Sequence, residues 1–277
     1  MLVPKVFRVK NIEREVVLIT GGGGGLGKAL AVRFSKQGAI VVLWDVNANG
    51  LNEANTAVKA IGGQCRTYLC DITKREEVYA TAKAVREEVG IVTILVNNAG
   101  IVSAKYFLDI PDQSIIKTME VNCMSQFWTC KAFLPDMMKA NHGHIVTIAS
   151  IAGLTGTDRL TDYCASKFAN VGLQESMRYE LMNLGMTGIH TTLVCPFYIN
   201  TGLFAGIKTP SLFPILKVDK VADSILIAVL TNSELVLLPK LAHLLFFVKG
   251  YVNMSRRTSQ LCFVIIRMFE VITIEKQ

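Results

Sequence analysis

The sequence predicts an α/β fold: a single Rossmann-type, doubly wound parallel sheet with helices on both faces. Continuous β-branched runs alternate with helical stretches up to about residue 200, and such runs are typical of parallel strands that helices cover on both faces. A glycine-rich turn follows the first run, as in sheets that bind ligands at the carboxyl ends of their strands. No linker rich in proline, glycine or serine and no internal repeat divides the 277 residues, so one domain is the simplest organisation.

The expected elements follow in the order strand, helix, strand, helix. Short apolar runs that end in polar or turn residues predict strands, and longer runs with a charged outer face predict helices. A proline inside a long helix removes one hydrogen bond, so we expect a bend near Pro135. The strands are expected at residues 16–20, 40–44, 67–70, 93–96, 144–150 and 190–194, and the helices at 28–37, 51–61, 74–89, 115–139 and 162–184.

The composition argues against several classes of protein. The seven cysteines and four histidines lack metal-ligand spacing, so we expect reduced thiols and no metal site. The net charge of +7 is compatible with nucleic acid or an anionic membrane, but the basic residues are dispersed, so we expect no nucleic-acid partner. The chain shows no secretory signal and no run of about 18 apolar residues that would span a membrane.

The glycine-rich turn, residues 20–27, reads Thr-Gly-Gly-Gly-Gly-Gly-Leu-Gly and opens the first expected helix. Glycine permits positive φ and lets the backbone approach a pyrophosphate at a helix N-terminus. We therefore expect a nucleotide-binding loop, with a merely flexible loop as the alternative. Asp45 ends the second strand, about 20 residues further on, where a carboxylate accepts ribose hydroxyls and repels a 2′-phosphate. Asp45, and the absence of arginine from the turn, favour NAD over NADP, although a helix cap or turn residue is the alternative for this position.

A second group of residues is suited to proton transfer. Tyr163 and Lys167 are four residues apart in an expected helix and so share one face. A phenol titrates near ~10 unaided, and a nearby ammonium together with a positive nicotinamide would stabilise its phenolate. Ser150, at the end of its strand, could hold a substrate oxygen. A surface Tyr-Lys pair without chemistry is the alternative.

Taken together, these motifs resemble the short-chain dehydrogenase/reductase family. The resemblance rests on T-G-x-x-x-G-x-G, on residues 97–100 (Asn-Asn-Ala-Gly), on Ser150 and on Tyr163-x-x-x-Lys167, and it covers about residues 12–205. It implies that Tyr163 is the general acid/base and that Lys167 lowers its pKa and binds the nicotinamide ribose. It further implies that Ser150 orients the substrate oxygen and that Asn122 supports a water in the proton relay.

The resemblance also implies a set of cofactor contacts. Asp71 would lie near adenine, Thr201 would touch the nicotinamide carboxamide, and residues 98–100 would stabilise the sheet beside the cofactor. The family usually has Pro-Gly where this chain has Pro196-Phe197, so we expect Phe197 to alter the substrate mouth. The full implied set is Gly21, Gly25, Leu26, Gly27, Asp45, Asp71, Ile72, Asn98, Ala99, Gly100, Tyr163, Lys167, Pro196 and Thr201.

Five short segments narrow the resemblance to one branch of the family. Residues 42–45, 131–135, 141–144, 162–167 and 194–197 resemble the branch of epidermal retinol dehydrogenases, retinal short-chain reductases and lipid-droplet 17β-hydroxysteroid dehydrogenases. The likeness implies an NAD-dependent oxidoreductase for a hydrophobic alcohol or carbonyl, with retinol or retinal first and a steroid or other lipid alcohol second. We also expect a homo-oligomer.

The last third of the chain is strongly apolar. We divide the chain into a basic and apolar stub at 1–11, the Rossmann domain at 12–238 and an apolar, basic extension at 239–277. Apolar clusters flanked by cations suit a helix lying in a lipid headgroup region. We therefore expect contact with the cytosol-facing surface of the endoplasmic reticulum membrane or of a lipid droplet. A last core strand at 235–238, with a lid helix and a dimer surface, is the alternative.

Two further classes of protein compete with an enzyme of this family. A catalytically idle lipid-droplet scaffold or nucleotide sensor is compatible with Phe197 and the apolar tail, but it would need neither Lys167 nor Ser150. A Rossmann-type methyltransferase gives no reason for the Tyr-x-x-x-Lys pair.

Overall fold

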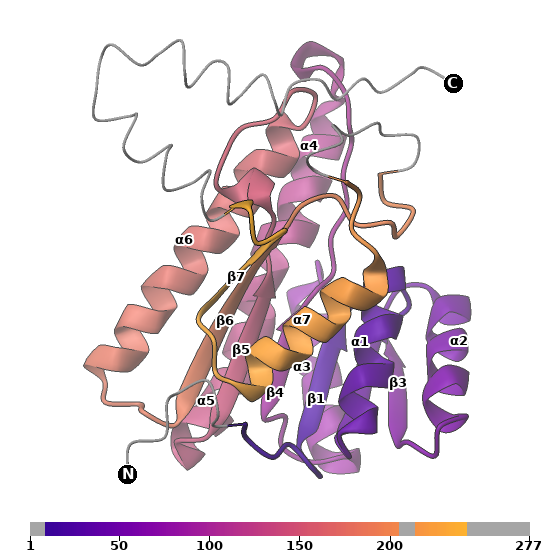
Figure 1. The fold of residues 1–277 in the computed structure, drawn as a ribbon, viewed down its shortest axis with the longest axis vertical. Helices are drawn as coiled ribbons and strands as arrows, with labels where there is room; N and C mark the ends of the chain where they lie inside the picture. Colours follow the sequence, from indigo (N-terminus) through magenta and orange to yellow (C-terminus); the bar gives the residue numbers. More distant parts are fainter. Residues whose placement is uncertain (1–8, 205–213, 243–277) are drawn as a thin grey trace.

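The computed structural model describes residues 9–204 and 214–242, which form a three-layer α/β/α sandwich around a parallel sheet (Figure 1). The strand order is β3-β2-β1-β4-β5-β6-β7, and every pairing between neighbouring strands is parallel. This confirms the predicted fold class. The strands are β1 (Val16–Thr20), β2 (Ile40–Asp45), β3 (Cys65–Leu69), β4 (Ile94–Asn97), β5 (Gly143–Ile148), β6 (Ile189–Pro196) and β7 (Leu235–Leu238).

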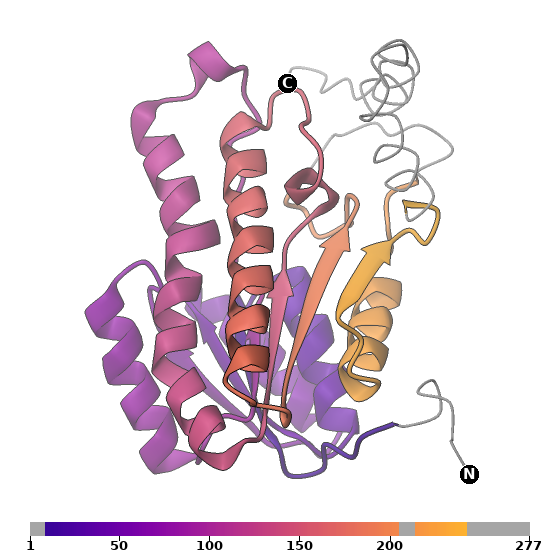
Figure 2. The same ribbon diagram turned by 90° about the vertical axis from the view of Figure 1, so that its left-hand side faces the viewer.

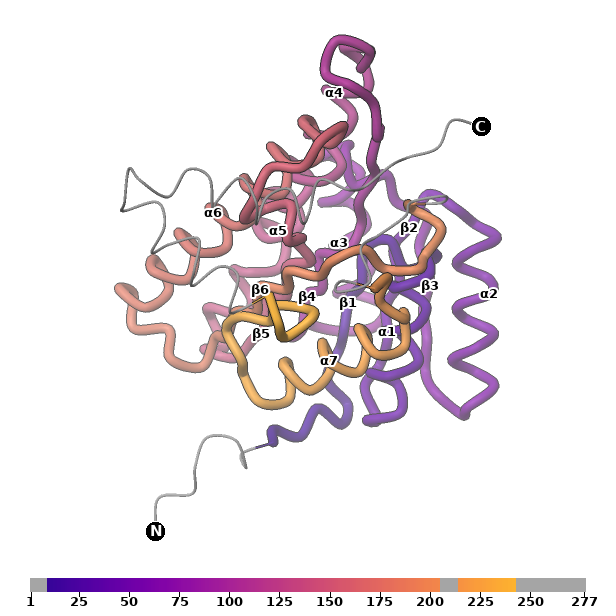
Figure 3. The backbone as a smooth tube through the Cα atoms, turned by 45° about the horizontal axis from the view of Figure 1, so that its top comes forward, coloured from indigo at the N-terminus to yellow at the C-terminus, as the bar shows by residue number. Residues whose placement is uncertain are grey.

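Helices cover both faces of the sheet (Figures 2 and 3). One apolar core lies between the sheet and α1, α2 and α7, and a second lies between the sheet and α3, α5 and α6. In β1, Val17 and Ile19 contribute to the first core while Leu18 contributes to the second, as the two-residue period of a strand requires. The helices are α1 (Gly25–Lys36), α2 (Ala48–Lys59), α3 (Arg75–Glu88), α4 (Asp112–Met119), α5 (Ser125–Ala140), α6 (Thr161–Asn183) and α7 (Val218–Leu230).

Two elements differ from the expectation. Helical conformation runs through the stretch expected at 115–139, but an unexpected π-helical turn, Glu120–Met124, divides it into α4 and α5. Helix α7 was not expected, although its buried residues recur at helical spacing along one face: Val221, Ala222, Ile225, Leu226 and Val229. It covers the sheet beside α1, and Figure 1 shows the two helices side by side.

Several expectations concern residues that lie outside the described ranges. They include residues 1–8 of the basic and apolar stub, the apolar clusters of the extension beyond residue 242, and Cys262. The other six cysteines are free and buried. Within the described ranges, no helix is long and apolar enough to cross a bilayer, and no cluster of side chains there could hold a metal ion.

Candidate active site

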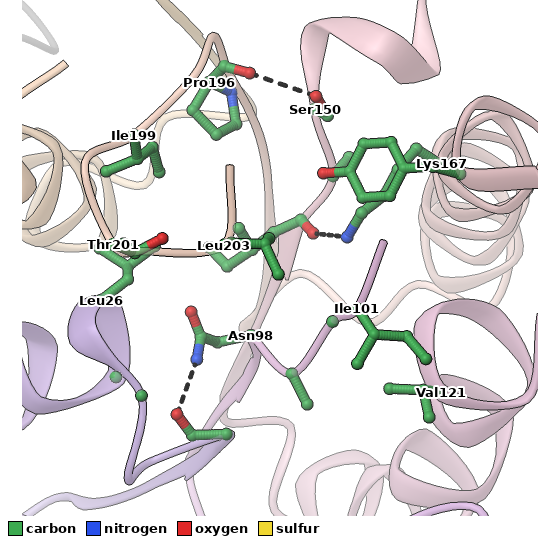
Figure 4. A pocket seen from close by; sticks show the side chains of 18 of the residues that line it. Leu26, Asn98, Ile101, Val121, Ser150, Lys167, Pro196, Ile199, Thr201 and Leu203 are labelled. Carbon is green, nitrogen blue, oxygen red and sulfur yellow. Dashed lines mark hydrogen bonds between the residues drawn. The ribbon is translucent and has the colours of Figure 1, made fainter. Parts of the chain in front are cut away.

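A cavity of about 620 Å³ opens at the carboxyl ends of the strands, where the strand order reverses between β1 and β4. Ligands bind at this switch point in doubly wound sheets. Figure 4 shows its two sides, with Leu26 and Thr201 opposite Ser150 and Lys167. The lining contains all of the residues that the sequence analysis singled out for the cofactor or for catalysis, except Asn122: Gly21, Gly25, Leu26, Gly27, Asp45, Asp71, Ile72, Asn98, Ala99, Gly100, Ser150, Tyr163, Lys167, Pro196 and Thr201.

The glycine turn brings backbone, rather than side chains, to the cavity. Gly21 has φ of +65°, and a Cβ on Gly27 would lie 2.2 Å from the Gly21 carbonyl oxygen, so both positions need glycine. Helix α1 begins at Gly25 without a capping side chain and without an acidic residue in its first turn. The amides of that turn have no acceptor within the helix, and together with the helix dipole they suit an anionic group.

Asp45 lies at the end of β2 and lines the same cavity. Its Oδ2 accepts a hydrogen bond from the Gly23 amide at 2.9 Å, and its Oδ1 accepts one from the Asn47 amide at 2.9 Å. Each carboxylate oxygen has two acceptor sites, so both retain capacity for a ligand hydroxyl. The Asn47 side chain accepts a hydrogen bond from the Gly50 amide as the N-cap of α2. The capping part of the alternative for Asp45 therefore belongs to Asn47, whereas the bond from the Asn47 amide gives Asp45 the turn role as well.

Asn98 joins the ends of the two central strands below the cavity. Its side-chain amide donates to the Thr20 carbonyl at 2.8 Å, and its main-chain amide donates to the Thr20 hydroxyl at 3.0 Å. The Ala99 amide donates to the same hydroxyl at 3.2 Å. These bonds fix the floor of the cavity where β1 and β4 diverge.

Ser150 follows β5 and is the N-cap of a short 3-10 turn, Ile151–Gly153. Its hydroxyl accepts a hydrogen bond from the Ala152 amide at 3.1 Å and donates to the Pro196 carbonyl at 3.4 Å. It also lowers the pKa of Tyr163 through a hydrogen bond. The serine oxygen is therefore fixed beside the phenol and at the cavity wall.

Tyr163 and Lys167 lie on one face of α6, and both are buried. The Lys167 ammonium is 5.5 Å from the centre of the Tyr163 ring and donates to the Ile148 carbonyl at 2.9 Å. Burial lowers the pKa of Lys167 to about 8, and burial raises the pKa of Tyr163 above its ordinary value. Without a cofactor, the phenol is therefore the neutral proton donor of the pair.

Asn122 lies in the π-helical turn and is fully buried. Its Oδ1 accepts from the Ile101 amide at 2.8 Å, and its Nδ2 donates to the Ile101 carbonyl and to the Ser166 hydroxyl, each at 3.0 Å. The Asn122 carbonyl accepts from the Gln126 side chain at 3.0 Å. Asn122 thus connects the segment after β4 to α6, one layer behind the cavity lining.

An aromatic group that the sequence analysis did not assign forms part of the cavity wall. The Tyr198 ring meets Phe197 and Phe204 edge-on, with centroid distances of 4.7 and 4.8 Å, and Phe204 meets Tyr163 edge-on at 5.7 Å. Phe197 therefore lines the cavity, as its place beside Pro196 suggested. Tyr198 and Phe204 carried no motif, because a contact between residues 163 and 204 depends on how β6 and α6 pack.

A parallel doubly wound sheet with a glycine turn at its switch point, and with Ser150, Tyr163 and Lys167 in the same cavity, defines the class of Rossmann-fold oxidoreductases. The family model described as short chain dehydrogenase matches residues 15–211. The chain therefore belongs to the short-chain dehydrogenase/reductase family, and it is an enzyme of the alcohol dehydrogenase/reductase type.

Curated relatives and solved structures agree with this assignment. Epidermal retinol dehydrogenase 2 of Homo sapiens is 46% identical over 89% of this chain and 81% of its own length. Estradiol 17-beta-dehydrogenase 11 of Mus musculus is 45% identical over 86% of this chain and 79% of its own length. A short-chain dehydrogenase/reductase from Burkholderia phymatum in complex with NAD has a TM-score of 0.77 at 26% identity, over 84% of this chain and 92% of its own. A metagenomic short-chain oxidoreductase in complex with NADP has a TM-score of 0.69 at 26% identity, over 83% of this chain and 97% of its own.

Proposed function

We propose that the chain is an NAD-dependent dehydrogenase/reductase that interconverts a hydrophobic alcohol and its carbonyl compound, with all-trans-retinol and retinal as the first candidate pair. The observation that carries the proposal is the joint presence of the glycine turn, Asp45, Ser150, Tyr163 and Lys167 in one cavity. The 46% identity to a protein named epidermal retinol dehydrogenase 2 supports the substrate class.

The residues present fit a dinucleotide. The first-turn amides of α1 would hold a pyrophosphate, and a Cβ at Gly27 would collide with the Gly21 carbonyl oxygen and distort the turn that receives it. Asp45 would accept the adenosine-ribose hydroxyls and repel a 2′-phosphate, which supports NAD. Asp71 and Ile72 would lie beside adenine, and Pro196 and Thr201 beside the nicotinamide.

The chemistry moves one hydride and one proton: both leave the alcohol during oxidation, and both are added to the carbonyl compound during reduction. When bound, NAD supplies the hydride acceptor, and NADH supplies the donor. The Ser150 hydroxyl would donate a hydrogen bond to the substrate oxygen, and the Tyr163 hydroxyl would give that oxygen its proton during reduction or remove it during oxidation. Lys167 would hold the nicotinamide ribose and favour the phenolate, while Asn122 would support a water on the path to solvent.

The cavity walls support an apolar substrate. Aromatic and aliphatic side chains line the cavity together with Tyr163: Ile101, Val121, Leu160, Phe197, Tyr198, Leu203 and Phe204. A membrane-dissolved alcohol would reach this site most readily from a lipid surface. We therefore include attachment to the cytosolic face of the endoplasmic reticulum or of a lipid droplet in the proposal, supported by the net charge of +7. We also include a homo-oligomer, supported by Phe168, Tyr179 and Met182 exposed on α6.

A 17β-hydroxysteroid or another lipid alcohol is the second candidate substrate, because estradiol 17-beta-dehydrogenase 11 is nearly as similar. An idle lipid-droplet scaffold is a third reading, and the complete set of Ser150, Tyr163 and Lys167 in the cavity favours an enzyme over it.

The deciding experiment is a substrate panel with the full chain in liposomes, containing retinol, estradiol and a long-chain fatty alcohol, with NAD and NADP side by side. We expect turnover of retinol with NAD. Tyr163→Phe should lower kcat at least 100-fold, since positioned acid–base catalysis contributes about 10²–10⁴-fold, while the Kd for NAD stays unchanged. Undiminished turnover by this variant would remove Tyr163 from its role. Cofactor binding without turnover of any substrate would favour the scaffold.

A further inference from the structure

Asp162, the residue before Tyr163, is a buried carboxylate outside the cavity lining, with 5% of its surface exposed. Its Oδ2 accepts hydrogen bonds from the Ser103 hydroxyl at 2.6 Å and from the Thr118 hydroxyl at 2.9 Å. Ser103 belongs to the segment between β4 and α4, and Thr118 belongs to α4. One side chain thus joins three parts of the chain that are distant in sequence.

The first turn of α6, which carries Tyr163, lacks the usual means of fixing a helix start. Its N-cap is Leu160, which offers no side-chain hydrogen bond. A capping serine, threonine or aspartate contributes about 1 kcal/mol, and an uncapped first turn frays. The lateral hydrogen bonds of Asp162 therefore restrain the turn that a cap would otherwise hold.

The hydrogen bonds of Asp162 also fix a segment that contributes to the wall of the cavity. Ile101, which lines the cavity, is hydrogen-bonded through both main-chain groups to Asn122. Two residues further on, Ser103 is bonded to Asp162. Figure 4 shows Ile101 and Lys167 on the same side of the cavity. The segment 101–103 is therefore fixed twice against the elements that carry the candidate catalytic side chains.

Burial of the Asp162 carboxylate destabilises the fold. The other oxygen, Oδ1, is buried and has no hydrogen-bond partner in the described part of the chain, and an unpaired buried oxygen destabilises the fold. Two hydrogen bonds to an ionised acceptor, and the positive end of α6, offset that cost. Those stabilising contacts all depend on the placement of the first turn of α6.

We propose that Asp162 is a positioning residue that holds the first turn of α6, and with it the Tyr163 hydroxyl, at a fixed distance from the segment 101–103, which contributes Ile101 to the cavity wall. This inference rests on the proposed role of Tyr163. It assigns Asp162 no contact with substrate or cofactor.

The test compares Asp162→Ala with Asp162→Asn, whose side-chain oxygen can still accept from both hydroxyls. Since a displacement of about 1 Å can cost 10²-fold in rate, we expect Asp162→Ala to lower kcat about 10- to 100-fold. The Kd for NAD should stay within about twofold because the glycine turn is untouched. Asp162→Asn should restore at least a third of kcat, and Ser224→Ala, on the surface of α7, serves as the unaffected control.

Amide hydrogen exchange across residues 160–166 gives a second readout that needs no substrate. Exchange should be faster in Asp162→Ala and close to wild type in Asp162→Asn. If Asp162→Ala does not fold, Ser103→Ala and Thr118→Val each remove one hydrogen bond and should show smaller changes in the same direction. Unchanged exchange and kcat in these variants, or equal damage from Asn and Ala, would overturn the inference. A wild-type chain without turnover would instead contradict the proposed function alone.

Discussion

At the scale of the residue, burial controls the chemistry of the cavity. Tyr163 and Lys167 are both almost fully buried, and burial opposes the charged form of each, so it raises the pKa of the phenol and lowers that of the ammonium to about 8. The pair thus starts as a neutral acid beside a base that titrates near neutral pH. Reduction of a carbonyl can use this state directly. In the proposed mechanism, oxidation would require the positive charge of a bound nicotinamide to lower the pKa of Tyr163.

Asp45 should determine the cofactor preference. We expect Asp45→Asn to weaken NAD binding and to change the ratio of the Kd values for NAD and NADP at least tenfold in favour of NADP. The reason is that the variant removes the charge that repels a 2′-phosphate, while its oxygen can still accept from the Gly23 amide. Isothermal titration with both cofactors measures the ratio. Asp71→Asn is the matched control and should leave the ratio of the two Kd values unchanged. An unaltered ratio in Asp45→Asn would argue against NAD selection at this position.

At the scale of the element, two irregular segments shape the site. The glycine turn lets α1 begin close to β1, and the π-helical turn at Glu120–Met124 directs Asn122 at the segment after β4. Such π-turns occur mostly as single bulges in α-helices and often at functional sites. Of the residues in these two segments, only Leu26 contributes to the two apolar cores.

Gly27→Ala tests the glycine turn. The added methyl group would lie 2.2 Å from the Gly21 carbonyl oxygen and 2.9 Å from the Gly22 Cα, so the turn must open. Overpacking of this kind costs about 1–3 kcal/mol, and we expect NAD binding to weaken at least tenfold. Gly172→Ala, with no atom within 4 Å of its Cβ, is the control and should stabilise α6 by about 1 kcal/mol. Urea unfolding measures the stability of the two variants, and cofactor titration measures their Kd for NAD. Normal NAD binding by Gly27→Ala would show that the turn is not the cradle.

At the scale of the whole molecule, the two ends of the sheet are specialised differently. The carboxyl ends hold the cavity, and the amino ends hold a chain of polar contacts that joins the start of the described chain to the sheet. Lys10 donates to His144 Nδ1 at 2.7 Å, His144 Nε2 donates to the Thr192 hydroxyl at 2.8 Å, and that hydroxyl donates to the Ser233 carbonyl at 2.6 Å. This pattern requires a neutral His144.

The stability of the fold should fall below pH 6.5. Burial, together with the charge of Lys10, holds the pKa of His144 well below its usual value of 6.5. Between the two pKa values only the unfolded chain binds the proton, so stability is lost as the pH falls, by up to about 1.4 kcal/mol per pH unit. Urea unfolding between pH 7 and 5.5 measures the slope. His144→Gln should reduce the slope of the unfolding free energy against pH. His142→Gln, at the surface, should leave that slope unchanged. An equal slope in both variants would assign the pH dependence to other groups.

The sequence alone predicted the fold class and most of the residues that line the candidate site. Continuous strands such as β1 and the glycine turn predicted the doubly wound sheet, because a strand buried on both faces must be apolar throughout. Ser150, Tyr163, Lys167 and Asp45 could be singled out because each follows a strand or shares a helix face with its partner. Local patterns determine local conformation, and in a parallel sheet all the strand ends meet at one edge.

The tertiary structure decided what no local pattern contains. The π-helical turn interrupts the expected helix at Asn122, whose side chain bonds to Ile101, 21 residues away. Asp162 gained its partners Ser103 and Thr118, and Tyr163 met Phe204, through packing of α6 against segments distant in the chain. These contacts depend on which elements become neighbours. That choice is made by burial over the whole molecule, so the residues proposed to bind a cofactor could be predicted from the sequence, whereas the residue proposed to position Tyr163 could not.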